Sequence, residues 1–284
     1  MSSSKTYRDR AWQALKPVLP IMLLIFLVAN LPDLLWTFLQ NALNLNPPMD
    51  AALYSDPERF MQAYSAFASE HGVLYSLLSL LFSILPIPLT LGAVGASQRI
   101  LRGEDVLVRH VLAYIPYTFR AIWLQICIVF YACGPMLLTL AVLLLAMLFL
   151  PASALNVLTV IFSIALIATG VLAIMRSYSM AAAEFLLAKQ PETRVSALME
   201  CSRTLMQGQR MNCFLLELSF IGWGMLLTLV SLLVASLAGY LAYSICSMLL
   251  SLLLSAYLTT AKAAFMDDLD GSASSADESG KMTE

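Results

Sequence analysis

Few residues of this chain have the types and spacing that catalysis or metal binding requires. The sequence contains no HExxH, GxSxG, Walker-loop or CxxC pattern, which are motifs that place metal ligands, nucleophiles or phosphate-binding backbone. Its two histidines, His71 and His110, fall in separate segments, so a histidine-rich metal site is not indicated. We therefore expect a protein that is not an enzyme, with no catalytic residues, no metal site and no cofactor.

Charged residues inside apolar segments are the more informative candidates. Six long apolar runs contain only three charged residues, Asp33, Arg120 and Glu217. A charge in hydrocarbon costs about 2.5–3.5 kcal/mol on insertion scales, so such a residue needs a partner or a function. Glu217 lies about one turn into the fifth run, at a depth comparable to that of Arg176 and Lys262.

We expect Glu217 to pair with Arg176 or Lys262, which would neutralise the charge and hold three helices together. Glu184, two turns past Arg176, completes a candidate inner-side charge cluster of Arg176, Glu184, Glu217 and Lys262. An ion or substrate relay through this cluster is the alternative. An aspartyl intramembrane protease needs two facing aspartates, whereas Asp33 is the sole acid in the outer half of any run.

The elements that must position these residues are long apolar helices. The apolar runs occupy approximately residues 17–39, 73–97, 119–150, 154–175, 213–237 and 240–261. Each can cross a hydrocarbon core, which takes about 20 residues. The chain is 60% hydrophobic and 12% charged, whereas about 25% of residues are charged in soluble proteins. The expected fold is all-α: a polytopic bundle of six transmembrane helices over residues 1–269, followed by a disordered acidic tail, residues 270–284.

The distribution of positive charge predicts the orientation of the bundle. Of the 16 Lys and Arg residues, Arg59 alone falls in the first, third or fifth loop. Positively charged loops stay on the cytoplasmic side during insertion, so we expect both termini in the cytoplasm. The five cysteines lie in runs or inner segments, so a disulfide framework is not indicated. Because no domain carries a basic surface, a nucleic-acid partner is not expected.

Charged inner segments with helical character precede three apolar hairpins, at residues 5–16, 104–120 and 191–212. This order suits an internal repeat, but any six-span protein with helical inner loops would resemble it. The third segment has the periodicity of an interfacial amphipathic helix. Its apolar face holds Val195, Leu198, Met199, Leu205 and Met206, and its polar face holds Arg194, Glu200, Arg203, Gln207 and Arg210. Arg194, Arg203 and Arg210 are the candidate residues for binding lipid or a partner; the alternative is a helix that packs under the bundle.

Prolines and hydroxyls within the spans suggest a different function. Pro86, Pro88 and the pair Gly134-Pro135 should kink the second and third spans, and kinked helices can surround a transported ion. The last span carries a stripe of hydroxyl side chains at i+4 spacing: Ser247, Ser251, Ser255 and Thr259. Such features also occur where helices simply pack closely.

The external loop at residues 40–72 contains chain breakers and aromatic residues. Asn46-Pro47-Pro48 and Asp56-Pro57 interrupt helical structure, and Asp56 is a candidate helix N-cap. Aromatic side chains recur at helical spacing after Pro57. This spacing favours an interfacial aromatic belt over a lid.

Four short motifs lie between Tyr178 and Trp223: Tyr178-Ser179-Met180, Gln190-Pro191-Glu192, the run from Ser202 to Gly208, and LSFIGW at 218–223. This stretch resembles the signature region of domain-of-unknown-function family 975, a family of bacterial integral membrane proteins. The family motif residues here are Tyr178, Pro191, Gly208, Ser219, Gly222 and Trp223. The closing segment 261–269 resembles the end of the family pattern, with Met266 in place of an aromatic residue and Gln190 in place of the acid before Pro191.

The resemblance implies a multi-span protein of a bacterial cytoplasmic (inner) membrane. It also implies distant kinship with the membrane domain of some glycerophosphodiester phosphodiesterases, from which no catalytic residues carry over. Our leading hypothesis is an uncharacterised, non-enzymatic inner-membrane protein that binds lipid or a protein partner through its cytoplasmic face. Membrane lipids, a membrane-protein partner or a second copy of the chain are the expected partners. The alternative is a permease or export accessory component that moves a small molecule or peptide.

Overall fold

The computed structural model describes residues 4–46, 56–149 and 152–281, and over these residues the chain is helical with no strand. Six stretches are long and apolar enough to cross a membrane: Ser4–Ala29, Glu58–Leu101, Arg109–Ala146, Ile161–Lys189, Arg210–Val234 and Ile245–Gly271. The expected all-α fold with six membrane-crossing segments is therefore confirmed, and the chain is a multi-pass membrane protein.

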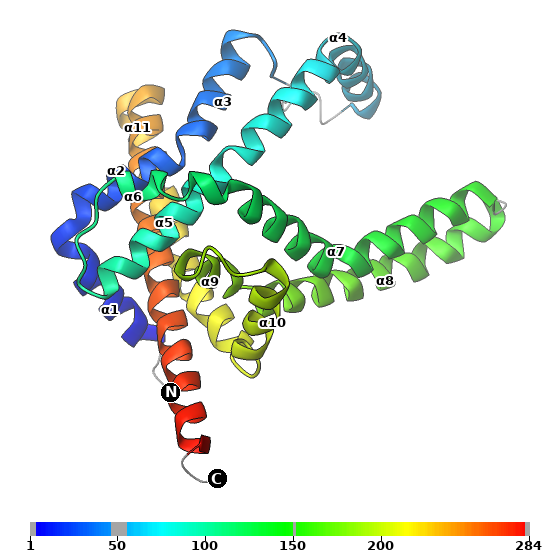
Figure 1. The fold of residues 1–284 in the computed structure, drawn as a ribbon. Coiled ribbons are helices and arrows are strands. Elements are labelled where there is room, and N and C mark those ends of the chain that lie inside the picture. The colour runs from blue at the N-terminus through cyan, green and yellow to red at the C-terminus, as the bar shows by residue number, and fades with distance from the viewer. Residues whose placement is uncertain (1–3, 47–55, 150–151, 282–284) are drawn as a thin grey trace.

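Figure 1 shows the order of the helices along the chain. They are α1 (Ser4–Leu15), η1 (Lys16–Val18), α2 (Leu19–Ala29), α3 (Leu31–Ala42), α4 (Pro57–Ile84), α5 (Pro86–Leu101), α6 (Arg109–Leu112), η3 (Ile115–Tyr117), α7 (Thr118–Phe149), α8 (Ala152–Ser179), α9 (Ala183–Lys189), α10 (Val195–Leu205) and α11 (Arg210–Lys281). Pro86 divides the second span into α4 and α5, as a residue without a backbone N–H should.

The start of α4 and the end of α5 show how single residues set the helix boundaries. The carboxylate of Asp56 accepts a hydrogen bond of 3.2 Å from the backbone N–H of Arg59, so the predicted N-cap of α4 is confirmed. Most of the breaker Asn46-Pro47-Pro48 lies outside the described residues. Gly103 adopts a φ of 74° just after α5, which ends that helix in the left-handed conformation that glycine tolerates. As a result, the inner segment 104–120 contains only short helices.

The last helix, α11, extends to Lys281; extending an existing helix avoids the unfavourable step of nucleating a new one. Disorder of the acidic tail, residues 270–284, stays a prediction.

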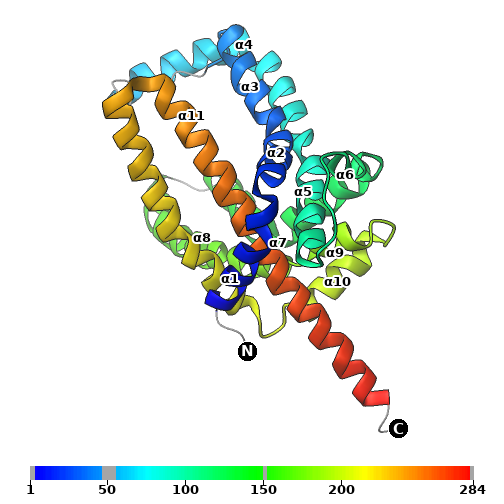
Figure 2. The same ribbon diagram turned by 90° about the vertical axis from the view of Figure 1, so that its left-hand side faces the viewer.

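The helix α11 contains both of the last two spans and folds back on itself (Figure 2). The rings of Phe220 and Tyr257 lie 4.9 Å apart, although 36 residues separate them in the sequence. The second arm packs against α1, α2 and α5 through small residues, and Ala256, Ala261 and Ala264 are fully buried. Small side chains let membrane helices approach closely.

The described ends of the chain lie toward the same end of the bundle, opposite the α3–α4 tip (Figures 1 and 2). The α7–α8 hairpin diverges from the other helices beyond its base (Figure 1). In the most apolar window of Ile161–Lys189 no residue is buried within the protein. This hairpin therefore presents apolar side chains, such as Ile164 and Ile167, that suit contact with lipid.

Close packing between α5 and the segment that follows it depends on two glycines. A Cβ added at Gly92 would lie 2.7 Å from both the Cα and the carbonyl oxygen of Val111. A Cβ at Gly95 would lie 2.8 Å from Cζ of Tyr114 and would overlap its hydroxyl. The absence of side chains at these positions lets α6 and Tyr114 pack directly on α5.

We predict that Gly92→Ala lowers the free energy of unfolding by about 1–3 kcal/mol, because the backbone of Val111 cannot move away cheaply. Gly95→Ala should also be destabilising, because moving the hydroxyl of Tyr114 away from the added methyl group would break its hydrogen bond to the carbonyl of Ala188. Gly170→Ala in α8 is the matched control, because open space surrounds this glycine. Thermal unfolding of the three variants in detergent measures the difference; equal midpoints for Gly92→Ala and Gly170→Ala would contradict the packing argument.

Candidate functional site

Glu217 joins three membrane spans. It lies on the first arm of α11 and forms an ion pair with Lys262 on the second arm. It also accepts a hydrogen bond of 2.6 Å from the hydroxyl of Tyr178 in α8. The expected pairing of Glu217 is therefore present with Lys262, and the third helix is held by Tyr178. From the sequence, Tyr178 was predicted only as a motif residue, because a tyrosine carries no charge that would mark it as a partner.

Arg176 does not join the ion pair of Glu217. Its guanidinium donates a hydrogen bond of 3.3 Å to the backbone carbonyl of Tyr131 in α7 and lies 5.4 Å from the centroid of the Tyr131 ring. Pro135, four residues after Tyr131, has no N–H to offer that carbonyl. Arg176 therefore satisfies the carbonyl that Pro135 leaves without a helical donor. For this reason its guanidinium does not pair with Glu217.

The short helix α9, which carries Glu184, is held in place by side chains of other helices. A helix of seven residues has little stability of its own. Three side chains from the α5–α7 region donate hydrogen bonds to carbonyls of α9 and of the turn that follows it. They are Gln98 to Phe185 at 2.9 Å, Tyr114 to Ala188 at 2.9 Å, and Arg120 to Pro191 at 2.5 Å. These contacts fix the position of Glu184.

Two cavities open between α5, α7, α8, α9 and α11. The larger, of about 480 Å³, is lined by Glu184, Glu217 and Lys262 together with Tyr178 and Gln125, among others. The smaller, of about 220 Å³, shares Glu184 and Gln125 with the larger one. The structure thus brings three of the four residues of the candidate charge cluster around one space, and it places Arg176 outside the lining.

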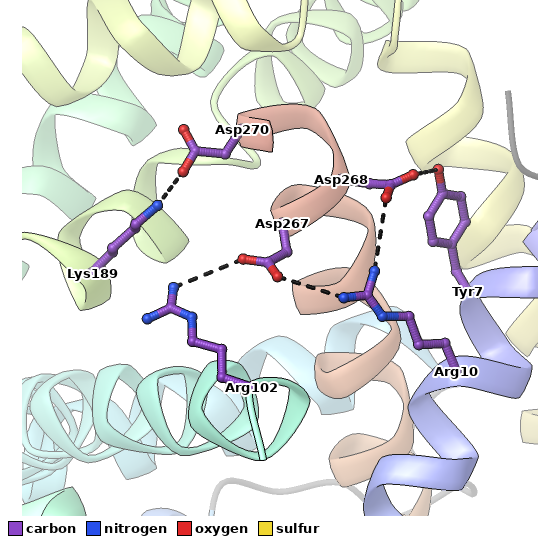
Figure 3. A network of polar contacts seen from close by, with 7 residues as sticks. All are labelled: Tyr7, Arg10, Arg102, Lys189, Asp267, Asp268 and Asp270. Atoms are coloured by element: carbon purple, nitrogen blue, oxygen red, sulfur yellow. Dashed lines mark hydrogen bonds and ion pairs between the residues drawn. The ribbon is translucent and has the colours of Figure 1, made fainter. Parts of the chain in front are cut away.

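A second polar network joins the end of the last span to three other elements (Figure 3). Three aspartates of α11 receive cationic or hydroxyl partners from α1, the end of α5 and α9. The contacts are Arg10 to Asp267 and to Asp268 at 3.7 Å each, Arg102 to Asp267 at 3.8 Å, Tyr7 to Asp268 at 3.0 Å, and Lys189 to Asp270. In the sequence these aspartates belong to the closing family motif and the acidic tail. Their partners could not be predicted, because they lie far away along the chain.

The apolar face of α10 packs on the protein. Val195, Leu198 and Met206 are buried, and the hydroxyl of Ser202 donates a hydrogen bond of 3.1 Å to the carbonyl of Ser179 at the end of α8. The predicted amphipathic periodicity is therefore present, but the apolar face covers the bundle core. This arrangement matches the packing alternative for the helix.

The polar face of α10 forms a shallow hollow with the start of α11. Its lining consists of Glu200, Arg203, Thr204, Gln207 and Arg210, around a volume of about 390 Å³. Arg203 lies 5.4 Å from the centroid of the Tyr131 ring. The Nε of Arg210 is buried and has no hydrogen-bond acceptor within the described ranges. Arg194, at the N-cap of α10, is exposed and lies outside this lining.

The remaining motif residues have structural positions. Pro191 lies in the turn that ends α9, and Gly208 adopts a φ of 78° between α10 and α11, a conformation that favours glycine. Ser219 donates a hydrogen bond of 2.6 Å to the carbonyl of Leu216. Gly222 has no neighbour within 4 Å of an added Cβ, and Trp223 is about half exposed (49%), so these two face away from the core.

The hydroxyl stripe of the last span does not line a path through the bundle. Ser251 and Ser255 are exposed, whereas Thr259 lines the larger cavity. Beside the stripe, Leu252, Ala256 and Thr260 are buried, each one residue further along the chain than a member of the stripe. The face of the second arm of α11 that packs inward is therefore displaced by one residue from the hydroxyl stripe, which we considered as a surface for close helix packing.

The chain was compared with known families, curated proteins and solved structures. The family described as "Protein of unknown function (DUF975)" matches residues 6–272. No curated protein matches the chain, and neither does any solved structure. The expected kinship with glycerophosphodiester phosphodiesterases has no support among these matches.

The ion pair of Glu217 and Lys262 generates a prediction for a double-mutant cycle. Each side chain is about a quarter exposed (28% and 27%), so the cost of leaving one charge unpaired is reduced by solvent. We expect Glu217→Gln or Lys262→Met alone to lower the free energy of unfolding by about 1–3 kcal/mol. The double variant should lose less than the sum, because it leaves no unpaired charge. Unfolding curves measured in detergent test this prediction. Strictly additive losses of the free energy of unfolding would show that Glu217 and Lys262 do not stabilise each other.

Proposed function

We propose that this chain, which belongs to the DUF975 family of proteins of unknown function, binds the phosphate headgroups of anionic lipids at its cytoplasmic face. In this proposal it is a membrane protein that is not an enzyme. The binding site is the hollow lined by Glu200, Arg203, Thr204, Gln207 and Arg210, here called the α10–α11 hollow. The observation that carries the proposal is the buried Nε of Arg210, which has no acceptor in the described part of the protein.

The arginines of the hollow differ from other cations of the chain in their partners. Arg10, Arg102 and Lys189 are paired with aspartates of α11. Among the residues described, neither Arg203 nor Arg210 forms an ion pair, although Glu200 lines the same hollow. Two guanidinium groups and one carboxylate leave the hollow with one net positive charge. Guanidinium groups bind phosphate oxygens in pairs of parallel hydrogen bonds.

The position of the hollow along the chain suits a lipid headgroup. Arg210 is the first residue of both α11 and the fifth membrane-crossing segment, so its side chain belongs near the boundary between hydrocarbon and headgroups. The start of a helix carries a partial positive charge that favours anions. Basic residues near the membrane surface attract anionic lipids, each by about 1 kcal/mol.

We predict that Arg203→Gln and Arg210→Gln each weaken the binding of short-chain phosphatidylglycerol about tenfold, equivalent to about 1.4 kcal/mol. The full-length protein in detergent is titrated, and lipid-dependent stabilisation against heat is the readout. Lys5→Gln is the matched control, because it removes one exposed positive charge from α1, outside the hollow.

Three ligands separate the possible sources of binding energy. Phosphatidylcholine tests whether net negative charge is needed, and inorganic phosphate tests whether the headgroup alone is bound. Binding of phosphatidylglycerol that is the same for the wild type, Arg203→Gln and Arg210→Gln would refute the proposal. A double variant that keeps lipid binding but loses a co-purifying protein would instead assign the surface to a protein partner.

The cytoplasmic location of this face is itself testable through Cys201 on α10. The residue is exposed, but partial burial of its thiol raises the pKa, and the carboxylate of Asp270 raises it further. Modification is therefore faster at alkaline pH, where more thiolate is present. In intact spheroplasts, we expect a membrane-impermeant maleimide to modify Gln62→Cys in the external part of α4 and to spare Cys201 until lysis. Modification of Cys201 in sealed spheroplasts would reverse the predicted orientation.

A further inference from the structure

The two cavities between the helices meet at Glu184 and Gln125. Both side chains line the cavity of about 480 Å³ and the cavity of about 220 Å³. On α9, the neighbours Ala183 and Phe185 are buried, whereas Glu184 remains accessible. Its carboxylate therefore faces the open space while the rest of the helix packs against the core.

The carboxylates around this space differ in their partners. Glu217 is paired with Lys262 and accepts a hydrogen bond from Tyr178. No hydrogen bond or ion pair reaches Glu184 from any residue in the described ranges; its interaction with Lys262 is a longer-range one. Two carboxylates and one ammonium group leave the lining with one net negative charge, and that charge lies at Glu184.

An unpaired carboxylate is unfavourable at this position. Glu184 lies near the C-terminal end of the fourth apolar stretch, Ile161–Lys189, and faces a cavity with partly apolar walls, where a charge without a partner is costly. A proton or a bound cation would neutralise it. The fixed contacts of Gln98, Tyr114 and Arg120 with the α9 region prevent the helix from turning Glu184 toward another partner.

The chemistry of the walls indicates which cation would fit. Apolar side chains, such as Ile128 and Ile174, form much of the larger cavity. Near Glu184, Gln125 offers an amide oxygen, and Thr90 offers a hydroxyl oxygen that already donates its proton to Ile87. A metal ion is less well matched, because the described residues contain no group of three or more carboxylate, imidazole or thiol side chains that could hold one.

We propose that the cavity around Glu184 is a binding site for a small primary amine with an apolar body. The protonated amine forms an ion pair with Glu184 and donates its other hydrogens to oxygens such as those of Gln125 and Thr90. The apolar body lies against the walls of the larger cavity, whose volume falls within the range of about 300–1,000 Å³ that is usual for small-molecule sites. This site is separate from the α10–α11 hollow and goes beyond lipid binding.

The test measures binding of radiolabelled benzylamine to the full-length protein in phosphatidylcholine nanodiscs, with empty nanodiscs as the background. Benzylamine is protonated at neutral pH, and benzyl alcohol is its uncharged counterpart. Glu184→Gln removes the charge at nearly constant size. Glu192→Gln is the matched control, because Glu192 is exposed in the turn after α9 and does not line either cavity.

We expect saturable benzylamine binding to the wild type and to Glu192→Gln, with an affinity at least tenfold lower for Glu184→Gln. Benzyl alcohol should bind the wild type at least tenfold more weakly than benzylamine. Ala181→Leu, which keeps the charge but narrows the larger cavity, should also weaken binding. The melting temperature of Glu184→Gln should equal or exceed that of the wild type, because an unpaired charge has been removed.

Specific outcomes would overturn the proposal. Benzylamine uptake no greater than in empty nanodiscs would do so, as would equal affinity of the wild type and Glu184→Gln. Equal binding of the amine and the alcohol would show that the cavity does not select for charge. If Glu184→Gln proves unstable, Ala181→Leu decides: undiminished binding to that variant places the amine elsewhere. Loss of phosphatidylglycerol binding in the Arg203 and Arg210 variants is a separate result that leaves this site unaffected.

Discussion

Polar groups inside a bilayer have no water to bond with, and the charged end of this bundle is organised by that constraint. Several backbone carbonyls that a helix cannot satisfy are reached by side chains of another helix. Arg176 donates a hydrogen bond to the carbonyl of Tyr131, which Pro135 leaves without a helical donor. Arg120 donates to the carbonyl of Pro191, and Ser202 donates to the carbonyl of Ser179 at the end of α8. Each contact links two elements, so satisfying the backbone also fixes the arrangement of the helices.

The second arm of α11 carries most of the ion pairs at this end of the bundle. Its small buried residues let α1, α2 and α5 approach it closely. Lys262 ties it to Glu217, and the aspartates at its end receive partners from α1, the end of α5 and α9 (Figure 3). The ion pairs at this end are partly exposed, so each contributes little alone. Their importance lies in joining four elements at one place.

Two side chains of the described residues mark the proposed binding sites: Glu184 in the cavity between the helices and Arg210 in the α10–α11 hollow. They carry opposite charges and lie in separate spaces. Both sites were partly visible in the sequence, since Glu184 and Arg210 belong to the predicted charge cluster and the predicted binding helix. The pairing of Glu217 with Lys262 was also among the expectations. The diversion of Arg176 to Tyr131 was not, because it depends on which helix packs beside Pro135.

The sequence by itself determined the number of membrane-crossing segments, the helical class and the family, because long apolar runs and local motifs need no knowledge of neighbours. It also identified the N-cap at Asp56 and the break at Pro86, which are local events. Only the tertiary structure decided which polar groups meet: Tyr178 with Glu217, Arg10 with Asp267 and Asp268, and Glu184 with an open cavity. Those contacts join residues far apart in the chain, and their partners are set by the rotation and close packing of helices, which no local pattern encodes.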